Sequence, residues 1–140
     1  LCNKKLNYKN LFFFNSLNTI KKTDVFFSSC AINYTKNPIE TIKSIIKLNI
    51  KYIYLTRTPL TENQSLEFKQ ISLLSSNGPC KINNEKEILI EYENKIISRR
   101  SFERMFENKF VIIAKYIDQK KAFSNKKKFF NTHTYIFKKK

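Results

Sequence analysis

One glycine in 140 residues, Gly78, is the feature that most restricts what this chain can fold into. In nucleotide-binding α/β folds, a Gly-rich turn after the first strand lets backbone N–H groups crowd around the ligand. This sequence has no such turn, although its strand and helix patterns suit the second half of such a fold. Because the chain also opens on Leu1, we expect residues 1–140 to be the C-terminal part of a longer protein. Its N-terminal, cofactor-binding half would then be missing.

The net charge of +16 has two explanations. A basic surface binds nucleic acid by releasing counterions from phosphates, so a small basic nucleic-acid-binding protein is one alternative. The enriched residues, however, have AT-rich codons, and drift in an AT-rich genome explains much of the lysine. Only four of the 27 basic residues are arginines, whereas bidentate recognition of phosphates and bases favours arginine. Nucleic acid is therefore the less favoured partner.

The cysteines Cys2, Cys30 and Cys80 are widely spaced and include no C-x-x-C pair. This pattern predicts neither a disulfide framework nor a zinc site, so we expect no metal, and reduced thiols in a cytoplasmic protein. Cys30 and Cys80 are predicted to be small buried hydrophobic residues. The apolar runs 11–14 and 110–114 are far shorter than the ~18 residues of a membrane-spanning helix. We expect no membrane span.

The first half of the chain contains three strand-like runs. Residues 11–14 and 24–27 are short, apolar and bounded by polar residues, as in strands buried on both faces of a parallel sheet. Residues 52–55 form the third run. We expect Pro59 to end that strand, because proline cannot donate to a β-ladder.

Between the second and third runs, residues 38–49 predict an amphipathic helix. Asn37 can cap it, Pro38 suits its first position, and Glu40 lies three residues after the cap. Isoleucines then recur at helical spacing on one face. Strand, helix and strand in about 35 residues form a βαβ unit, which requires parallel strands and a right-handed crossover.

Residues 61–97 are expected to be an insertion beside this sheet. Apolar residues alternate from 88 to 92, and residues 93–95 are suited to a turn, so we expect a small hairpin there.

The last part of the chain predicts a second helix followed by strands. Ser98 is suited to cap a helix with an aromatic face, and residues 110–114 form an apolar run directly after it. We expect residues 119–131 to be a basic loop and residues 134–137 to be the last strand.

Ligands of open α/β sheets bind beyond the carboxyl ends of the parallel strands. Two turns meet this condition, residues 28–34 and 56–59. We expect any site on this chain to lie there. His133, the only histidine, is not expected near either turn and is predicted to be inert.

Several short blocks around these turns resemble a known family, the S-adenosylmethionine-dependent methyltransferases that accompany bacterial surface-polysaccharide genes, within the class I group. Residues 24–34 resemble that family's fourth strand and its exit, with an aspartate, apolar residues and paired serines. Residues 55–59 are similar to its Asp-Arg-Thr-Pro element, except that Thr56 replaces the acidic residue. Further blocks are Asn37 with Pro38, residues 78–80 and residues 98–116.

The resemblance implies an α/β fold, namely the C-terminal half of a Rossmann-like class I sheet with parallel strands and a final antiparallel strand. It implies S-adenosylmethionine as cofactor, gripped mainly by the missing half. Ser28 and Ser29 would border the methionine end of the cofactor, and Tyr34 and Arg57 would lie on the acceptor side. The acceptor would be a small molecule, such as a sugar or a polysaccharide precursor. An isolated half-sheet would expose an open edge and an apolar face.

The resemblance assigns no catalytic residue. Methyl transfer is an in-line displacement at a sulfonium, so a protein mainly has to align donor and acceptor. Each predicted site residue also has a structural explanation: the serines can satisfy backbone groups, Tyr34 can pack, and Arg57 can form an ion pair. Thr56 leaves open a second alternative, a non-catalytic α/β interaction module.

Overall fold

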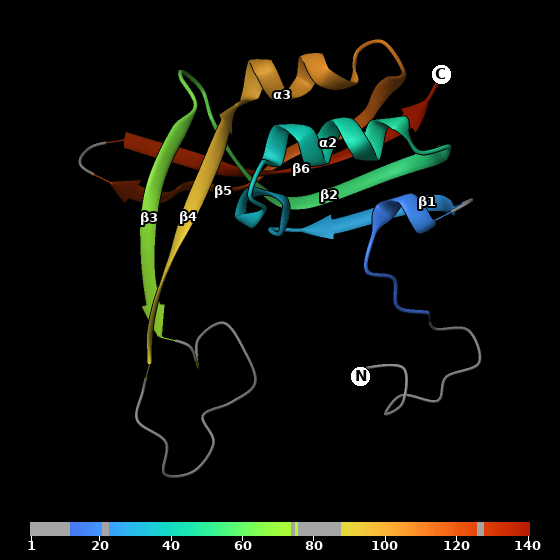
Figure 1. Ribbon diagram of the computed structural model, residues 1–140. Coiled ribbons are helices and arrows are strands. Elements are labelled where there is room, and N and C mark those ends of the chain that lie inside the picture. The colour runs from blue at the N-terminus through green and yellow to red at the C-terminus, as the bar shows by residue number, and fades with distance from the viewer. Residues whose placement is uncertain (1–11, 21–22, 74, 76–87, 126–127) are drawn as a thin grey trace.

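The computed structural model describes residues 12–20, 23–73, 75, 88–125 and 128–140. They form an α/β fold in which six strands build one mixed sheet and two α-helices cover one of its faces (Figure 1). The elements in chain order are η1 (Leu17–Thr19), β1 (Thr23–Ser29), η2 (Ile32–Tyr34), α2 (Pro38–Lys47), β2 (Ile50–Thr61), β3 (Leu66–Leu73), β4 (Leu89–Ser98), α3 (Arg99–Phe106), β5 (Phe110–Asn125) and β6 (Lys128–Lys139).

The predicted βαβ unit is confirmed. β1 and β2 run parallel with α2 between them in sequence, and their register pairs Val25 with Tyr52. The N-cap of α2 is Asn37, whose Oδ1 accepts a hydrogen bond from the backbone N of Glu40 at 3.3 Å. Ser98 caps α3 in the same way by accepting from the backbone N of Ser101. These short-range signals therefore positioned both helices correctly.

The final strand is antiparallel, as the resemblance implied. β6 lies between β2 and β5 and runs antiparallel to both. β3 and β4 form a second antiparallel pair, which joins the sheet only where β4 meets the end of β2. Most pairings are therefore antiparallel, and the long parallel pairing is that of β1 with β2.

Proline does not end β2, which was the first incorrect expectation. The strand continues through Pro59 to Thr61. On one side of β2, the pairing with β1 ends at Thr56 and the pairing with β4 begins at Leu60. Pro59 falls in this gap, where the described strands give β2 a neighbour only on its β6 side. A residue without an N–H is tolerated at such an interruption.

Three further expectations are corrected. Of the predicted strand 11–14, the described residues 12–14 are exposed and lie outside any strand. Residues 93–95 are not a turn, because β4 runs straight through them. The basic loop expected over 119–131 is mostly strand, since β5 extends to Asn125 and β6 begins at Lys128. Cys80, Gly78 and the rest of the block 78–80 lie outside the described residues.

The core lies between the helices and one face of the sheet. Ile42 and Ile45 of α2 and Phe102 and Phe106 of α3 are buried against it, and the ring of Phe106 stacks on Phe137 of β6 with centroids 4.1 Å apart. Figure 1 shows α2 and α3 together over this face. Burial of these side chains supplies the main driving force for the helix–sheet packing.

The opposite face of the sheet is largely uncovered in the described part. Val25 and Phe27 of β1 are 53% and 59% exposed, and Tyr52 and Tyr116 are also exposed. Within the same part, β1 pairs only with β2, so its other edge is open. β1 was expected to be buried on both faces, and this is wrong for the described chain. The described residues thus leave one strand edge open and one apolar face exposed.

Candidate functional site

The sheet forks at the carboxyl end of β1. Up to Thr56 the strand β2 runs beside β1, and from Leu60 onward it runs beside β4. At the fork, Cys30 and Arg57 both have φ 49°, in the left-handed region. Side chains with a Cβ disfavour this region, and strained backbone of this kind tends to cluster at ligand sites. The two residues are adjacent, since the N of Cys30 donates to the O of Thr56 at 3.0 Å.

Two of the predicted site residues, Ser29 and Arg57, meet at this fork. The Oγ of Ser29 accepts hydrogen bonds from the Oγ1 of Thr56 at 2.9 Å and from the Nε of Arg57 at 3.0 Å. The backbone N of Arg57 donates to Asp118 on β5, at the bulge where β2 and β6 shift register. In the described part, the Arg57 guanidinium has no carboxylate partner, so it can still meet an anionic group of a ligand.

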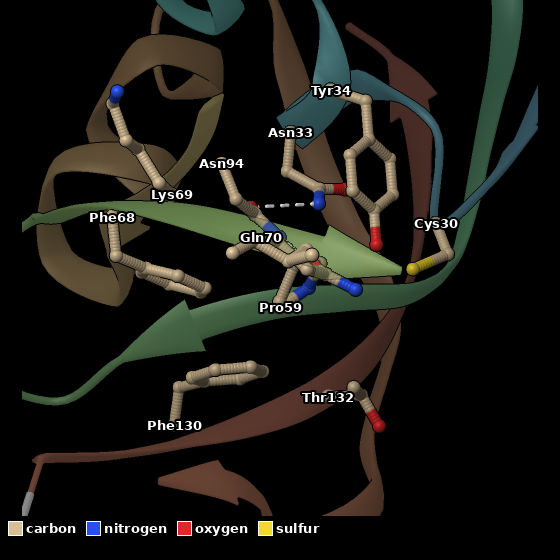
Figure 2. Close-up of a pocket in the computed structure, with 11 residues that line it drawn as sticks. Cys30, Asn33, Tyr34, Pro59, Phe68, Lys69, Gln70, Asn94, Phe130 and Thr132 are labelled. Carbon is tan, nitrogen blue, oxygen red and sulfur yellow. Dashed lines mark hydrogen bonds between the residues drawn. The ribbon is translucent and has the colours of Figure 1, made fainter. Parts of the chain in front are cut away.

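A cavity of about 380 Å³ opens beside the fork, between the end of β1 and the β3–β4 pair. Figure 2 shows side chains from five elements turned toward it. Tyr34 of η2 and Cys30 form one wall, and Phe68 of β3 and Phe130 of β6 form another. A concave, mainly apolar pocket with a few polar groups is the usual form of a small-molecule site.

Three amide side chains form a hydrogen-bonded chain at this cavity. The Nδ2 of Asn33 donates to the Oδ1 of Asn94 at 3.0 Å, and the Nδ2 of Asn94 donates to the Oε1 of Gln70 at 3.0 Å. Asn33 and Asn94 are buried, and the Oδ1 of Asn33 has no hydrogen-bond partner. In the described part the Nε2 of Gln70 has no acceptor either. The amides therefore fix one another and leave one donor group at one end.

The titratable groups on this wall stay neutral at ordinary pH. Burial raises the pKa of the Cys30 thiol above its usual value, against the lowering effects of Arg57 and of a hydrogen bond from Tyr34. Burial also raises the pKa of the Tyr34 phenol, reinforced by Cys30 and Tyr92. Neither group is therefore poised to act as a base or a nucleophile at neutral pH.

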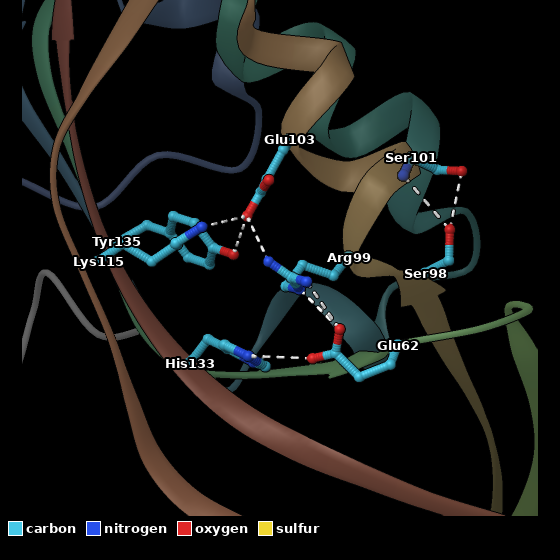
Figure 3. Close-up of polar contacts among 8 residues, drawn as sticks. All are labelled: Glu62, Ser98, Arg99, Ser101, Glu103, Lys115, His133 and Tyr135. Carbon is cyan, nitrogen blue, oxygen red and sulfur yellow. Dashed lines mark hydrogen bonds and ion pairs between the residues drawn. The ribbon is translucent and has the colours of Figure 1, made fainter.

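A second polar cluster lies under α3, shown in Figure 3. The Oε1 of Glu103 accepts from the buried Tyr135 hydroxyl at 2.6 Å and from the Nζ of Lys115 at 3.1 Å. Arg99 bonds Glu62 at 2.8 Å. Burial works to raise the pKa of Glu103, but the hydrogen bonds from Tyr135 and Lys115 and the nearby cations hold it below its usual range. These contacts tie α3 to β5 and β6 and serve a structural role.

His133 was expected away from both turns, and this is wrong. In the β2–β6 register it lies opposite Thr58. Its side chain is buried at 2% exposure, its Nδ1 has no partner, and its Nε2 lies 3.9 Å from Glu62. Burial lowers the pKa of His133, only partly offset by Asn131 and Glu62. The histidine is neutral and belongs to the cluster under α3.

Two further observations concern the described residues only. No three His, Cys, Asp or Glu side chains in that part come together as metal ligands. None of its helices has the length and apolar character needed to cross a membrane.

The fold resembles part of one known structure. No protein-family model matches the chain, and no curated protein matches it. Among solved structures, the chain is similar to the crystal structure of an S-adenosylmethionine-dependent methyltransferase from Clostridium acetobutylicum ATCC 824, with a TM-score of 0.52 and 11% identity. The match covers 88% of this chain and 61% of the methyltransferase chain. The fold is in part that of a methyltransferase.

The structure brings together some of the predicted site residues. Ser29 and Arg57 are in contact, and Tyr34 lines the cavity next to Cys30. Ser28 pairs with Leu55 in the strand register and is not among the cavity-lining residues. The ion pair considered for Arg57 is not formed in the described part, where its guanidinium bonds a hydroxyl.

Sequence reasoning missed most of the cavity. Asn94 and Gln70 lie in a segment read as an insertion, and Phe130 lies in the expected basic loop. Apolar and polar residues alternate only from 66 to 69, which is a short signal for β3. Further along the strand the pattern reverses, since Ile71 and Leu73 are exposed and Gln70 is half-buried. No local signal marks the amides, because asparagine is common throughout this chain.

Proposed function

We propose that this chain forms the C-terminal part of a class I S-adenosylmethionine-dependent methyltransferase that acts on a saccharide or saccharide precursor. The observation that carries the proposal is a cavity at the carboxyl end of β1 in a sheet whose fold resembles a methyltransferase. This is the position at which α/β sheets bind their ligands. The saccharide acceptor rests on the resemblance of the short sequence blocks alone.

The uncovered parts of the sheet support a longer protein. Among the described residues, one edge of β1 has no neighbouring strand, and Val25 and Phe27 expose apolar surface on the sheet face opposite α2 and α3. Further strands and helices of the same domain would satisfy both. The match covers 61% of the methyltransferase chain, so a protein of that length has further residues that could form these strands and helices.

The proposed roles follow from the fork. Ser28 and Ser29 would border the methionine end of the cofactor, with Arg57 beside Ser29 free to meet an anionic group, and Tyr34 would face the acceptor. When bound, S-adenosylmethionine supplies the methyl group to be displaced. The protein's task is to hold the acceptor in line with it, because alignment is worth up to ~7–11 kcal/mol of the barrier.

The test is cofactor binding by two versions of the protein. A version extended by its upstream coding sequence is expected to bind S-adenosylmethionine in calorimetry, whereas the 140-residue chain alone is not. Arg57→Ala in the extended version should weaken binding, and Lys51→Ala, an exposed residue of the same strand, should not. If the extended version shows no binding, the proposal fails and the non-catalytic interaction module becomes the better explanation.

A further inference from the structure

One wall of the cavity beside the fork is aromatic. Phe68 of β3 and Phe130 of β6 form it together, and Figure 2 shows their rings one above the other. The rings stack with centroids 6.4 Å apart and planes 24° from parallel. A third ring between them would need about 3.5 Å on each side, or about 7 Å in all, so the pair has no room for one. The stacked pair instead offers a flat ligand an aromatic surface on which to lie.

The polar groups of the cavity suit an uncharged planar ring. The amide chain from Asn33 through Asn94 to Gln70 holds the Gln70 amino group in place as a donor. The Tyr34 hydroxyl and the Thr132 hydroxyl can each donate or accept. Side-chain amides recognise nucleobase edges, which carry a donor and an acceptor side by side, and proteins stack unpaired bases on aromatic rings.

The lining of the cavity carries little charge. The only ionised side chain among the lining residues is Lys69, which Figure 2 shows turned away from the cavity and which pairs with Glu91. Cys30 and Tyr34 remain protonated. The cavity therefore suits an uncharged part of a substrate.

We propose that this cavity binds the nucleobase of a nucleotide-linked saccharide, stacked on the aromatic wall of Phe68 and Phe130 and recognised by Gln70. This inference rests on the proposed function for the identity of the substrate, and on the cavity alone for the nucleobase. A planar base can also come from the cofactor, whose adenosine has the same chemistry. The occupant is assigned to the substrate because its saccharide would then extend from the cavity toward Cys30 and the neighbouring Arg57.

The test is binding of small probes to the 140-residue chain, followed by NMR. The probes are uridine, 3-methyluridine, adenosine, S-adenosylmethionine and a methyl glycoside that has no base. Uridine is expected to bind, with 3-methyluridine weaker because its methyl group blocks the hydrogen-bonding edge, and the glycoside should not bind. Equal binding of the glycoside, or no binding of any nucleoside at millimolar concentration, would overturn the proposal. Binding of adenosine and S-adenosylmethionine without uridine would assign the cavity to the cofactor and also overturn it.

Matched variants locate the binding. Phe68→Ala should lower the affinity for uridine about 5- to 150-fold, since stacking of a base on an aromatic side chain contributes ~1–3 kcal/mol. Leu73→Ala, at an exposed position of the same strand outside the cavity lining, is the control and should leave the affinity within about twofold. The probe comparison needs no variant, so the proposal stays testable if Phe68→Ala does not fold. Uridine binding by a chain whose extended version fails to bind S-adenosylmethionine would support this inference and reject the proposed function.

Discussion

Glycine at position 57 should stabilise this protein relative to alanine at the same position. Arg57 has φ 49° and bonds Ser29 through its side chain. Arg57→Gly and Arg57→Ala both remove that bond, so their difference isolates the backbone. A residue with a Cβ costs roughly 1–2 kcal/mol in the left-handed region. Glycine avoids this cost, but the greater conformational entropy of its unfolded chain lowers the free energy of unfolding by about 0.4–1 kcal/mol. The net expectation is about 0.5–1 kcal/mol in favour of glycine.

The same pair of substitutions at Lys51 is the control. Lys51 is an exposed residue of the same strand, and it forms an ion pair with Asp24 that both substitutions remove. Its backbone is extended, so glycine should be less stable than alanine there by about 0.5–1 kcal/mol. The sign of the difference should therefore reverse between positions 51 and 57.

The measurement is urea unfolding of the four variants. With a slope of roughly 1–3 kcal/mol per molar urea, the glycine variant at position 57 should have a midpoint roughly 0.2–1 M above that of its alanine partner. A glycine variant that is less stable than alanine at both positions would show that Arg57 is not held in a left-handed conformation. The fork would then carry no backbone strain at Arg57.

Three further results are expected from the cluster under α3. Tyr135→Phe should lower the free energy of unfolding by about 1.5–3 kcal/mol in urea, because it removes a buried hydrogen bond to the Glu103 carboxylate, and an unchanged midpoint would contradict that bond. Folding lowers the pKa of Glu103, so this carboxylate contributes its full stabilisation above the unfolded pKa of about 4.3. That stabilisation is lost as the pH falls through the folded pKa. In Glu103→Gln, the free energy of unfolding should therefore depend less on pH over this range. Folding also lowers the pKa of His133, so as the pH falls the unfolded chain takes up this proton before the folded chain does. The free energy of unfolding should therefore fall as the pH drops below about 6.5. His133→Gln should abolish this pH dependence, whereas Glu103→Gln should preserve it.

The features that the sequence predicted correctly depend on residues close together in the chain. The cap at Asn37 and the cap at Ser98 each act within one helical turn, and both are confirmed. The parallel pairing of β1 and β2 follows because a short helix connects them, which permits few arrangements. Such features need no knowledge of the rest of the fold.

The failures concern features that depend on distant partners. Residues 119–131 are rich in lysine and resemble a loop, but pairing between β5 and β6 makes most of them strand. Residues 11–14 are apolar enough for a strand, yet residues 12–14 have no strand partner in the described part. Strand formation depends on having a neighbour to pair with, so apolar character alone was an unreliable guide.

The candidate site was half predictable for the same reason. The cavity borders residues 28–34, one of the two segments in which a site was expected from the ends of the parallel strands. Pro59 of the other segment also lines it, but residues 56–59 belong to β2 and are not the expected turn. The amides of Asn94 and Gln70 reach the cavity from strands far along the chain, and Asn94 lies 61 residues from its partner Asn33. Only the fold brings them together.

The fork explains why strain, cavity and amides occur at one place. Where β1 ends and β4 has not yet begun, β2 loses a neighbour on one side for the residues around Arg57. The chain leaves β1 through the left-handed Cys30 and returns as η2, which brings Asn33 and Tyr34 against the β3–β4 pair. In a continuous sheet, another strand would occupy this space, and the polar side chains of η2 could not lie there. The gap between two strand neighbours is therefore what creates the pocket, and the amides are held there because a buried polar group needs a partner.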